Sequence, residues 1–192
     1  MTRASETKAG RRSDAVRNAS AVQVAARRAF ERLGGDLTMD DVAEEAGLSK
    51  GTVYKSFPSR DCLIEAMTIE TLKEATTAYE AAARSDDPAG ALAEFLSVRP
   101  LTAAGRAQMT APAQSSGRVR RALADTARAL EDLLDVLKAE GLVDPAVNAW
   151  HIRVLVRGLY SVLPDYPNCS AADAEQLLAI VMRGIGIKAE RS

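Results

Sequence analysis

Apolar residues recur at steps of three and four along most of the chain, which is the spacing of one face of an α-helix. The first such stripe predicts a helix from about Asp14 to Leu33, ended by Gly34-Gly35. Its apolar positions are Ala15, Ala19, Val22, Ala26, Ala29 or Phe30, and Leu33. No segment shows the alternation of apolar and polar residues that marks a half-buried strand, so the pattern predicts an all-α protein.

Two short helices are predicted between Thr38 and Phe57. Thr38 is a suitable N-cap for the first, and Gly47 ends it because glycine tolerates a left-handed backbone. Ser49 can cap the second helix, which runs through Lys55. Two short helices joined by a glycine-bearing turn are typical of a helix-turn-helix, whose second helix enters the major groove of DNA.

The second of these helices carries side chains suited to DNA. Lys50 and Lys55 can neutralise phosphates or reach guanine, and the Tyr54 hydroxyl can bond a phosphate. The small residues Gly51 and Thr52 allow close approach to base edges. The pattern therefore predicts a DNA-binding surface.

A longer motif surrounds this turn, and its members are Phe30, Thr38, Val42-Ala43, Ala46-Gly47-Leu48-Ser49, Gly51-Thr52-Val53-Tyr54, Phe57-Pro58-Ser59-Arg60-Asp61 and Leu63. Together they resemble the N-terminal domain of the TetR family of transcriptional regulators, over roughly residues 14 to 66. The resemblance implies a homodimer that presents two recognition helices to a roughly palindromic DNA operator. The DNA-binding residues expected on this basis are Thr38, Ser49, Lys50, Gly51, Thr52, Tyr54, Lys55 and Arg60.

The charge distribution agrees with a DNA-binding N-terminal part. The whole chain has a net charge of −1. Residues 1 to 35 contain eight Lys or Arg and three acids, which is a local charge of +5, and local charge decides phosphate binding because salt screens distant charges. Residues 1 to 12 are expected to form a basic, flexible arm, read either as a solvated terminus or, by the resemblance, as minor-groove contacts through Arg11 and Arg12.

The remaining helices are predicted from stripes and breaks. Their expected bounds are about Arg60 to Ala83, Ala89 to Val98, Arg118 to Gly141, Asp144-Pro145 to Leu163, and Ala171 to Ile185, with an irregular segment at 99–117. We therefore expect a helix-turn-helix domain at 13–58 and a helical regulatory and dimerisation domain at 59–192. The resemblance implies that the last two helices pair with those of a second subunit.

The resemblance also implies a cavity for a small-molecule effector in the second domain. Candidate lining residues are Met67, Tyr79, Phe95, Met109, Trp150, His151, Arg153, Arg157 and Tyr160. The alternative for the aromatic and Met residues is ordinary core packing. Arg153 and Arg157 lie four apart on one helix, which suits either an anion site or a solvated edge paired with Asp132 or Asp135.

Other classes of function find little support. Cys62 and Cys169 lie far apart without metal spacing, so we expect reduced thiols, no metal site and no cofactor. No phosphate-binding loop or nucleophile motif is present, which argues against an enzyme. The chain has neither a secretory signal nor an apolar run of membrane-spanning length, so a cytoplasmic protein is expected. By the resemblance, the expected function is that of a repressor which a small-molecule effector releases from DNA. The alternatives are an activator, a regulator controlled by another protein, and a helical ligand-binding or protein-interaction module without DNA binding.

Overall fold

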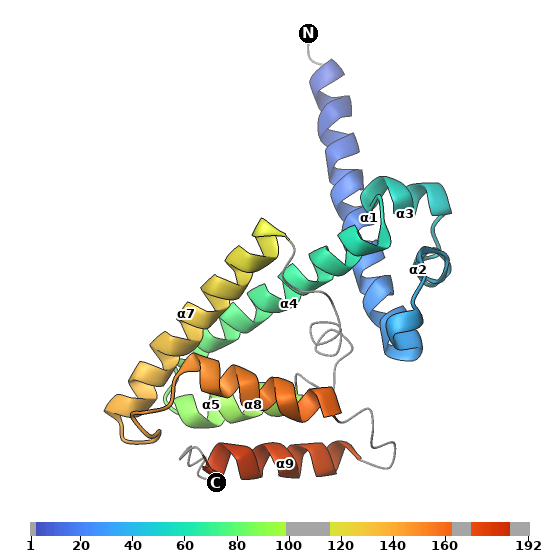
Figure 1. The fold of residues 1–192 in the computed structure, drawn as a ribbon. Coiled ribbons are helices and arrows are strands. Elements are labelled where there is room, and N and C mark those ends of the chain that lie inside the picture. Colours follow the sequence, from blue (N-terminus) through green and yellow to red (C-terminus); the bar gives the residue numbers. More distant parts are fainter. Residues whose placement is uncertain (1–2, 99–115, 163–169, 185–192) are drawn as a thin grey trace. The chain divides into compact units, whose positions relative to one another are not determined.

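The computed structural model describes residues 3–98, 116–162 and 170–184. Within these ranges the regular secondary structure consists of helices, which confirms the predicted all-α class (Figure 1). The helices are α1 (Arg3–Leu33), a 3-10 helix (Gly34–Asp36), α2 (Met39–Ala46), α3 (Lys50–Ser56), α4 (Arg60–Ala82), α5 (Pro88–Val98), α7 (Gly117–Ala139), α8 (Ala149–Val162) and α9 (Ala171–Gly184). The chain divides into two compact units, Met1–Thr68 and Ile69–Ser192.

In the first unit, α1, α2 and α3 pack against one another around a small apolar core. Phe30 from α1, Val42 from α2 and Val53 from α3 are buried, and Phe57 closes the end of α3. These four motif residues therefore form the core of the three-helix unit.

Helix α1 begins earlier than expected. It starts at Arg3 rather than near Asp14, so residues expected to form a flexible arm are part of the helix. The segment from Arg3 to Ser13 contains no proline and is rich in Ala, Glu, Lys and Arg, which have high helix propensity. The prediction placed the start of the helix next to the first apolar residue of the stripe. The apolar stripe marks the part of a helix that packs against the core, and the helix itself extends further toward the N-terminus.

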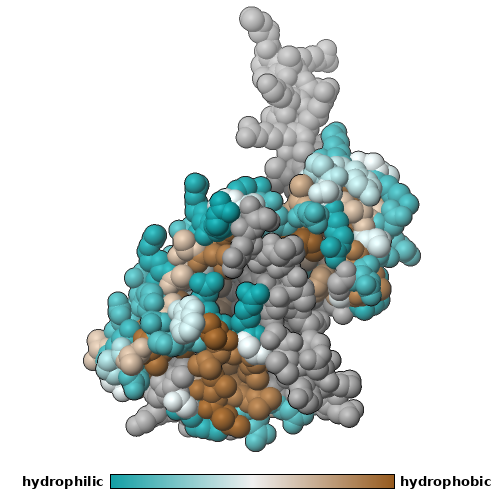
Figure 2. Space-filling view, viewed as in Figure 1, coloured by the Kyte–Doolittle hydropathy of each residue, from teal (hydrophilic) through white to brown (hydrophobic). Residues whose placement is uncertain are grey.

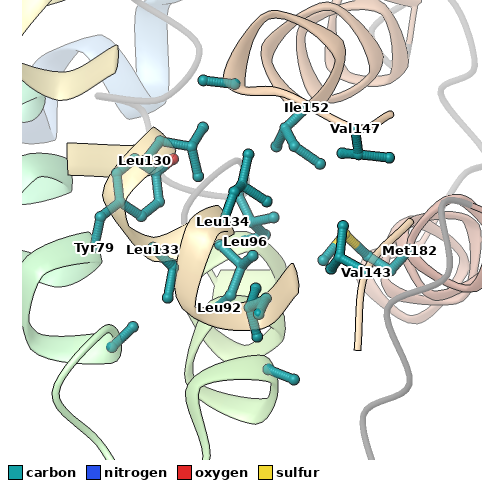
Figure 3. Packing of buried hydrophobic residues seen from close by; sticks show 14 of the residues in the cluster. Tyr79, Leu92, Leu96, Leu130, Leu133, Leu134, Val143, Val147, Ile152 and Met182 are labelled. Carbon is teal, nitrogen blue, oxygen red and sulfur yellow. The ribbon is translucent and has the colours of Figure 1, made fainter. Parts of the chain in front are cut away.

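In the second unit, α5, α7, α8, α9 and the part of α4 after Thr68 enclose the larger core. Figure 3 shows side chains from these helices converging on one another. The Tyr79 and Phe95 rings meet edge to face with centroids 5.2 Å apart. Among the residues of this core are Leu92, Leu96, Leu130, Leu133, Leu134, Leu137, Val143, Val147, Ile152, Leu178 and Met182.

Helix α8 begins later than expected, and the prediction that Pro145 occupies its first position is wrong. Asp144 instead forms a turn, in which its carboxylate accepts from the Ala146 N–H and its carbonyl from the Val147 N–H. Asn148 is the residue before the helix: its side-chain oxygen accepts from the His151 N–H at 3.1 Å, and its own N–H donates to His151 Nδ1 at 3.1 Å. The side-chain cap therefore fixes the start at Ala149.

Helix α9 begins with a similar reciprocal cap. Ser170 Oγ accepts from the Asp173 N–H at 3.2 Å, and Asp173 Oδ2 accepts from the Ser170 N–H at 2.9 Å. This confirms the expected start of the last helix and adds the Ser-x-x-Asp signal that defines it. Residues 99–115 of the predicted irregular segment lie outside the described residues, as do Met109, Cys169 and the side chain of Tyr160. Gly117, predicted to belong to that segment, is instead the first residue of α7.

Candidate nucleic-acid interface

A reciprocal cap fixes the start of α2. Thr38 Oγ1 accepts from the Asp41 N–H at 3.2 Å, and Asp41 Oδ2 accepts from the Thr38 N–H at 2.8 Å and from the Thr38 hydroxyl. These hydrogen bonds, first that from the hydroxyl and then that from the backbone, lower the pKa of the Asp41 carboxyl. The Thr38 side chain, expected to touch phosphate, thus has a structural role as well.

The turn between α2 and α3 has the geometry that the sequence predicted. Gly47 adopts φ +61°, in the left-handed region, and its N–H donates to the carbonyls of Ala43 and Glu44. The Leu48 N–H donates to the Ala43 carbonyl at 3.0 Å. Glycine is suited to this position because a side chain there is strained. This turn sets the direction in which α3 leaves α2.

Local hydrogen bonds also hold the start of α3. Ser49 Oγ accepts from the Thr52 N–H at 3.3 Å and lies 2.9 Å from Thr52 Oγ1. Ser49 is therefore the N-cap, as predicted. The Thr52 side chain is half-buried, with its hydroxyl fixed against Ser49.

Three residues expected to contact DNA lie on the exposed side of α3. Tyr54 is 46% exposed, while its neighbour Val53 is fully buried. Lys55 is exposed and forms no ion pair within the described parts of the chain. A Cβ placed on Gly51 would meet no atom closer than Ser49 Oγ at 4.0 Å, so the core does not require a glycine there. This side of α3 is a cationic and hydroxyl-bearing surface.

Lys50 has a partner that sequence reasoning missed. Its Nζ lies 2.6 Å from Asp40 Oδ2 in the first turn of α2. The hydrogen bond to Asp40 and then the charge of that carboxylate raise the pKa of Lys50. Asp40 also lies in the first turn of α2, where the helix dipole favours a negative charge. No sequence signal marks this pair, because the turn between the two helices brings together residues ten positions apart.

Arg60, expected to contact phosphate, has a structural contact. Its Nε donates to the Leu37 carbonyl at 2.8 Å, which joins the start of α4 to the loop before α2. A second link is the ion pair between Arg32 of α1 and Glu45 of α2, at 3.1 Å. Both links lie in the first unit, which is called the head from here on. The side chains of Arg11 and Arg12 lie outside the described part of the chain.

The expected effector residues in the described part of the chain belong to three helices, α4, α5 and α8. Met67 is buried in the first unit, whereas Phe95 packs beside Tyr79 in the core of the second. His151 belongs to the cap of α8, which favours the structural interpretation of this residue.

The remaining candidates lie on the surface of α8. Trp150 is 65% exposed, and Arg153 and Arg157 are exposed. The expected pairing of these arginines with Asp132 or Asp135 is not seen among the described residues, and Asp135 pairs with Lys138 at 3.6 Å instead. The predicted effector pocket therefore stays a prediction.

An apolar surface lies on α8 and α9, which contact each other in the second unit. Figure 2 shows hydrophobic side chains gathered over these helices. The exposed apolar face consists of Trp150, Val154, Leu155, Leu177 and Ile180. Glycines on the same helices, Gly158 and Gly184, have open space where a side chain would be. Apolar faces of this kind mark interaction sites.

The described ranges also bear on metal binding and on membrane insertion. They contain no cluster of three His, Cys, Asp or Glu side chains arranged to hold a metal ion. None of the helices in them combines the length and apolar character needed to cross a membrane.

Comparisons with known proteins agree with the geometry of the head. Residues 23–67 match the model of the family described as bacterial regulatory proteins, tetR family, which confirms the resemblance. No curated protein sequence matches the chain.

Solved structures show the same fold over most of the chain. A TetR transcriptional regulator from Streptomyces coelicolor is 24% identical with a TM-score of 0.65, and the match covers 89% of this chain and 99% of that one. A TetR regulatory protein from Mycobacterium vanbaalenii is also 24% identical with a TM-score of 0.65, covering 92% and 99%. SmeT, the repressor of a Stenotrophomonas maltophilia multidrug efflux pump, is 17% identical with a TM-score of 0.58, covering 86% and 89%.

Proposed function

We propose that this chain, a TetR-family transcriptional regulator with a DNA-binding N-terminal domain, represses transcription by binding a palindromic operator as a homodimer. The observation that carries the proposal is the surface of α3. Val53 is fully buried against α1 and α2, while Tyr54 is exposed and Lys50 and Lys55 extend into solvent. The helix is thus anchored by its apolar side and presents cations and hydroxyls on its outer side.

The roles of the individual residues follow from their positions. Lys50, Gly51 and Thr52 occupy the first turn of α3, which is the part of a recognition helix that reaches base edges. Tyr54 and Lys55 lie further along and contact phosphates, as do Thr38 and Arg60. Phosphate contacts fix the position of the head on DNA, and base contacts select the sequence.

Dimerisation is assigned to the exposed apolar face of α8 and α9. Pairing this face with the same face of a second copy removes Val154, Leu177 and Ile180 from water, and burial of apolar area is favourable. A two-fold pair of heads then binds two half-sites about one helical turn apart or somewhat more. This symmetry is the reason for proposing a palindromic operator.

Control by a small molecule is the remaining part of the proposal. Its support is the likeness of most of the chain to structures of TetR regulators and of a protein described as a repressor. An effector that binds the second unit of this chain and favours a conformation with weak operator affinity releases the DNA.

The experiment that tests the proposal is selection of bound sequences from random double-stranded DNA by the purified protein, at two or more salt concentrations. Enrichment of a palindrome is the expected result, and it also gives the half-site spacing and leads to the regulated promoter. Salt-sensitive binding without an enriched sequence contradicts sequence-specific regulation. Failure to bind DNA at any salt concentration favours the interaction-module alternative.

A further inference from the structure

Asp40 binds the ammonium group of the residue assigned to base reading. Its Oδ2 lies 2.6 Å from Lys50 Nζ, and the two side chains are 59% and 66% exposed. Because both are in contact with water, core packing does not force them together. The pair joins the first turn of α2 to the first turn of α3.

We propose that Asp40 is a specificity-determining residue, which orients Lys50 toward a base edge and disfavours its transfer to a phosphate. The inference rests on the proposed reading of DNA by α3. Asp40 acts through Lys50 and is therefore a positioning residue.

The argument depends on the different chemistry of bases and phosphates. A lysine ammonium has three N–H donors, so Lys50 can keep its bond to Asp40 while it donates to the O6 and N7 acceptors of guanine, which carry no net charge. Approach to a phosphate instead brings the Asp40 carboxylate toward a second anion, and like charges repel. The pair therefore weakens contacts that every DNA sequence offers and leaves the base contact intact.

The consequence for non-specific binding is measurable. A cation already neutralised by Asp40 releases fewer counterions from DNA, so it adds less to the salt dependence of binding. Asp40→Asn keeps the size of the side chain and removes its charge. We expect this variant to bind non-operator DNA up to about fivefold more tightly per head, which is the effect of one exposed ion pair.

Glu44 provides a matched control. It is exposed on the same helix, four residues further along. Glu44→Gln removes one negative charge from α2 without touching Lys50, so it measures the effect of net charge alone.

The experiment measures the affinity of the full-length protein by fluorescence anisotropy, for the selected operator and for a scrambled duplex, across a salt series. For Asp40→Asn we expect a lower ratio of operator to scrambled affinity, and a scrambled-duplex salt slope steeper by up to about 0.9 per head. Glu44→Gln is expected to keep the wild-type ratio. In a Lys50→Met background, Asp40→Asn is expected to have no more effect than Glu44→Gln.

Three outcomes overturn the inference in distinguishable ways. Wild-type protein that binds no DNA overturns the proposed function as well. Wild-type protein that selects an operator, together with an unchanged ratio in Asp40→Asn, overturns only the role of Asp40. An equal effect of Asp40→Asn with and without Lys50 shows a general charge effect and also overturns that role.

Discussion

The hydroxyl oxygens of Thr76 and Thr126 lie 3.0 Å apart and connect α4 to α7 within the second unit. Thr126 Oγ1 also lies 3.1 Å from the Leu72 carbonyl oxygen and 2.8 Å from that of Ala122, and Thr76 Oγ1 lies 3.0 Å from the Leu72 oxygen. Each hydroxyl has one proton to donate. The two hydroxyl protons are therefore shared among two carbonyl acceptors and the contact between the hydroxyls, in a small network formed by the two threonine side chains.

Thr126→Val is expected to lower the free energy of unfolding by about 1 kcal/mol, because it removes a buried hydrogen-bonding partner and leaves the Thr76 hydroxyl with fewer partners. Thr76→Val with Thr126→Val is expected to cost less than the sum of the single changes, since replacing both partners by apolar groups of the same shape leaves no polar atom unsatisfied. Urea denaturation of the four proteins measures the coupling. Strict additivity would show that the two hydroxyls act independently.

The cap of α2 predicts a dependence of stability on pH. The hydrogen bonds from Thr38 hold the pKa of the Asp41 carboxyl below its ordinary value of 3.8. A carboxyl with a lower pKa in the folded state contributes stability above its unfolded-state pKa and loses it as the pH falls through the folded-state value. We therefore expect wild type to melt at a higher temperature than Asp41→Asn, with the largest difference at neutral pH.

The same difference is expected to shrink as the pH falls below 3.8, because Asp41 becomes protonated in both states. Thermal unfolding followed by circular dichroism from neutral to acidic pH measures it. Thr38→Ala serves as a second variant, with an expected loss of about 1 kcal/mol at neutral pH from removal of the cap. A wild-type to Asp41→Asn difference that stays constant down to acidic pH contradicts the hydrogen-bonded carboxylate.

The bounds of α2 and α3 could be predicted from the sequence because local residues set them. Thr38 and Ser49 each accept a hydrogen bond from the N–H three residues later, and Gly47 ends α2 through its left-handed backbone angle. Pro145 misled the prediction of α8, because the side chain of Asn148 competes for the same role and the Ala149 N–H is bound by Glu131 of α7 at 3.0 Å. That second contact depends on the tertiary fold.

In the candidate site, too, local features could be predicted from the sequence and contacts between helices could not. The DNA-binding side chains of α3 could be predicted, because they belong to consecutive residues of one exposed helix. The contacts of Lys50 with Asp40 and of Arg60 with Leu37 could not be predicted, since each joins segments that only the folded head brings together.

Gly51→Ala is expected to separate folding from DNA binding. A Cβ at this position meets no atom closer than 4.0 Å, and alanine favours a helix, so the head should be as stable as wild type or more stable by up to about 1 kcal/mol. Operator affinity is expected to fall tenfold or more, on the order of the value of one base contact, because the added methyl group occupies space needed by a base edge. Thermal unfolding and anisotropy measure the two effects, and unchanged operator affinity would show that Gly51 does not approach a base.

Lys55→Ala is expected to weaken binding to every DNA sequence and to flatten the salt dependence by about 0.9 per head, as the loss of one phosphate contact requires. Lys50→Ala is expected to change sequence preference instead. Lys73→Ala, which removes an exposed charge from the second unit, is the control for net charge. Competition assays on operator variants separate these results, and a uniform loss across all variants for Lys50→Ala would argue against base reading by this residue.

Ile180→Glu is expected to dissociate the homodimer, because it places a charge within the apolar face of α8 and α9, where the wild-type side chain is 50% exposed in the single chain. Val24→Glu is the matched control, since Val24 is 48% exposed but belongs to α1. Sedimentation equilibrium gives the association state. The chain's one tryptophan, Trp150, lies on the same face, so its fluorescence should shift to shorter wavelength as wild-type protein is concentrated and should not do so in Ile180→Glu. An Ile180→Glu protein that remains dimeric while Val24→Glu dissociates would move the interface away from the last two helices.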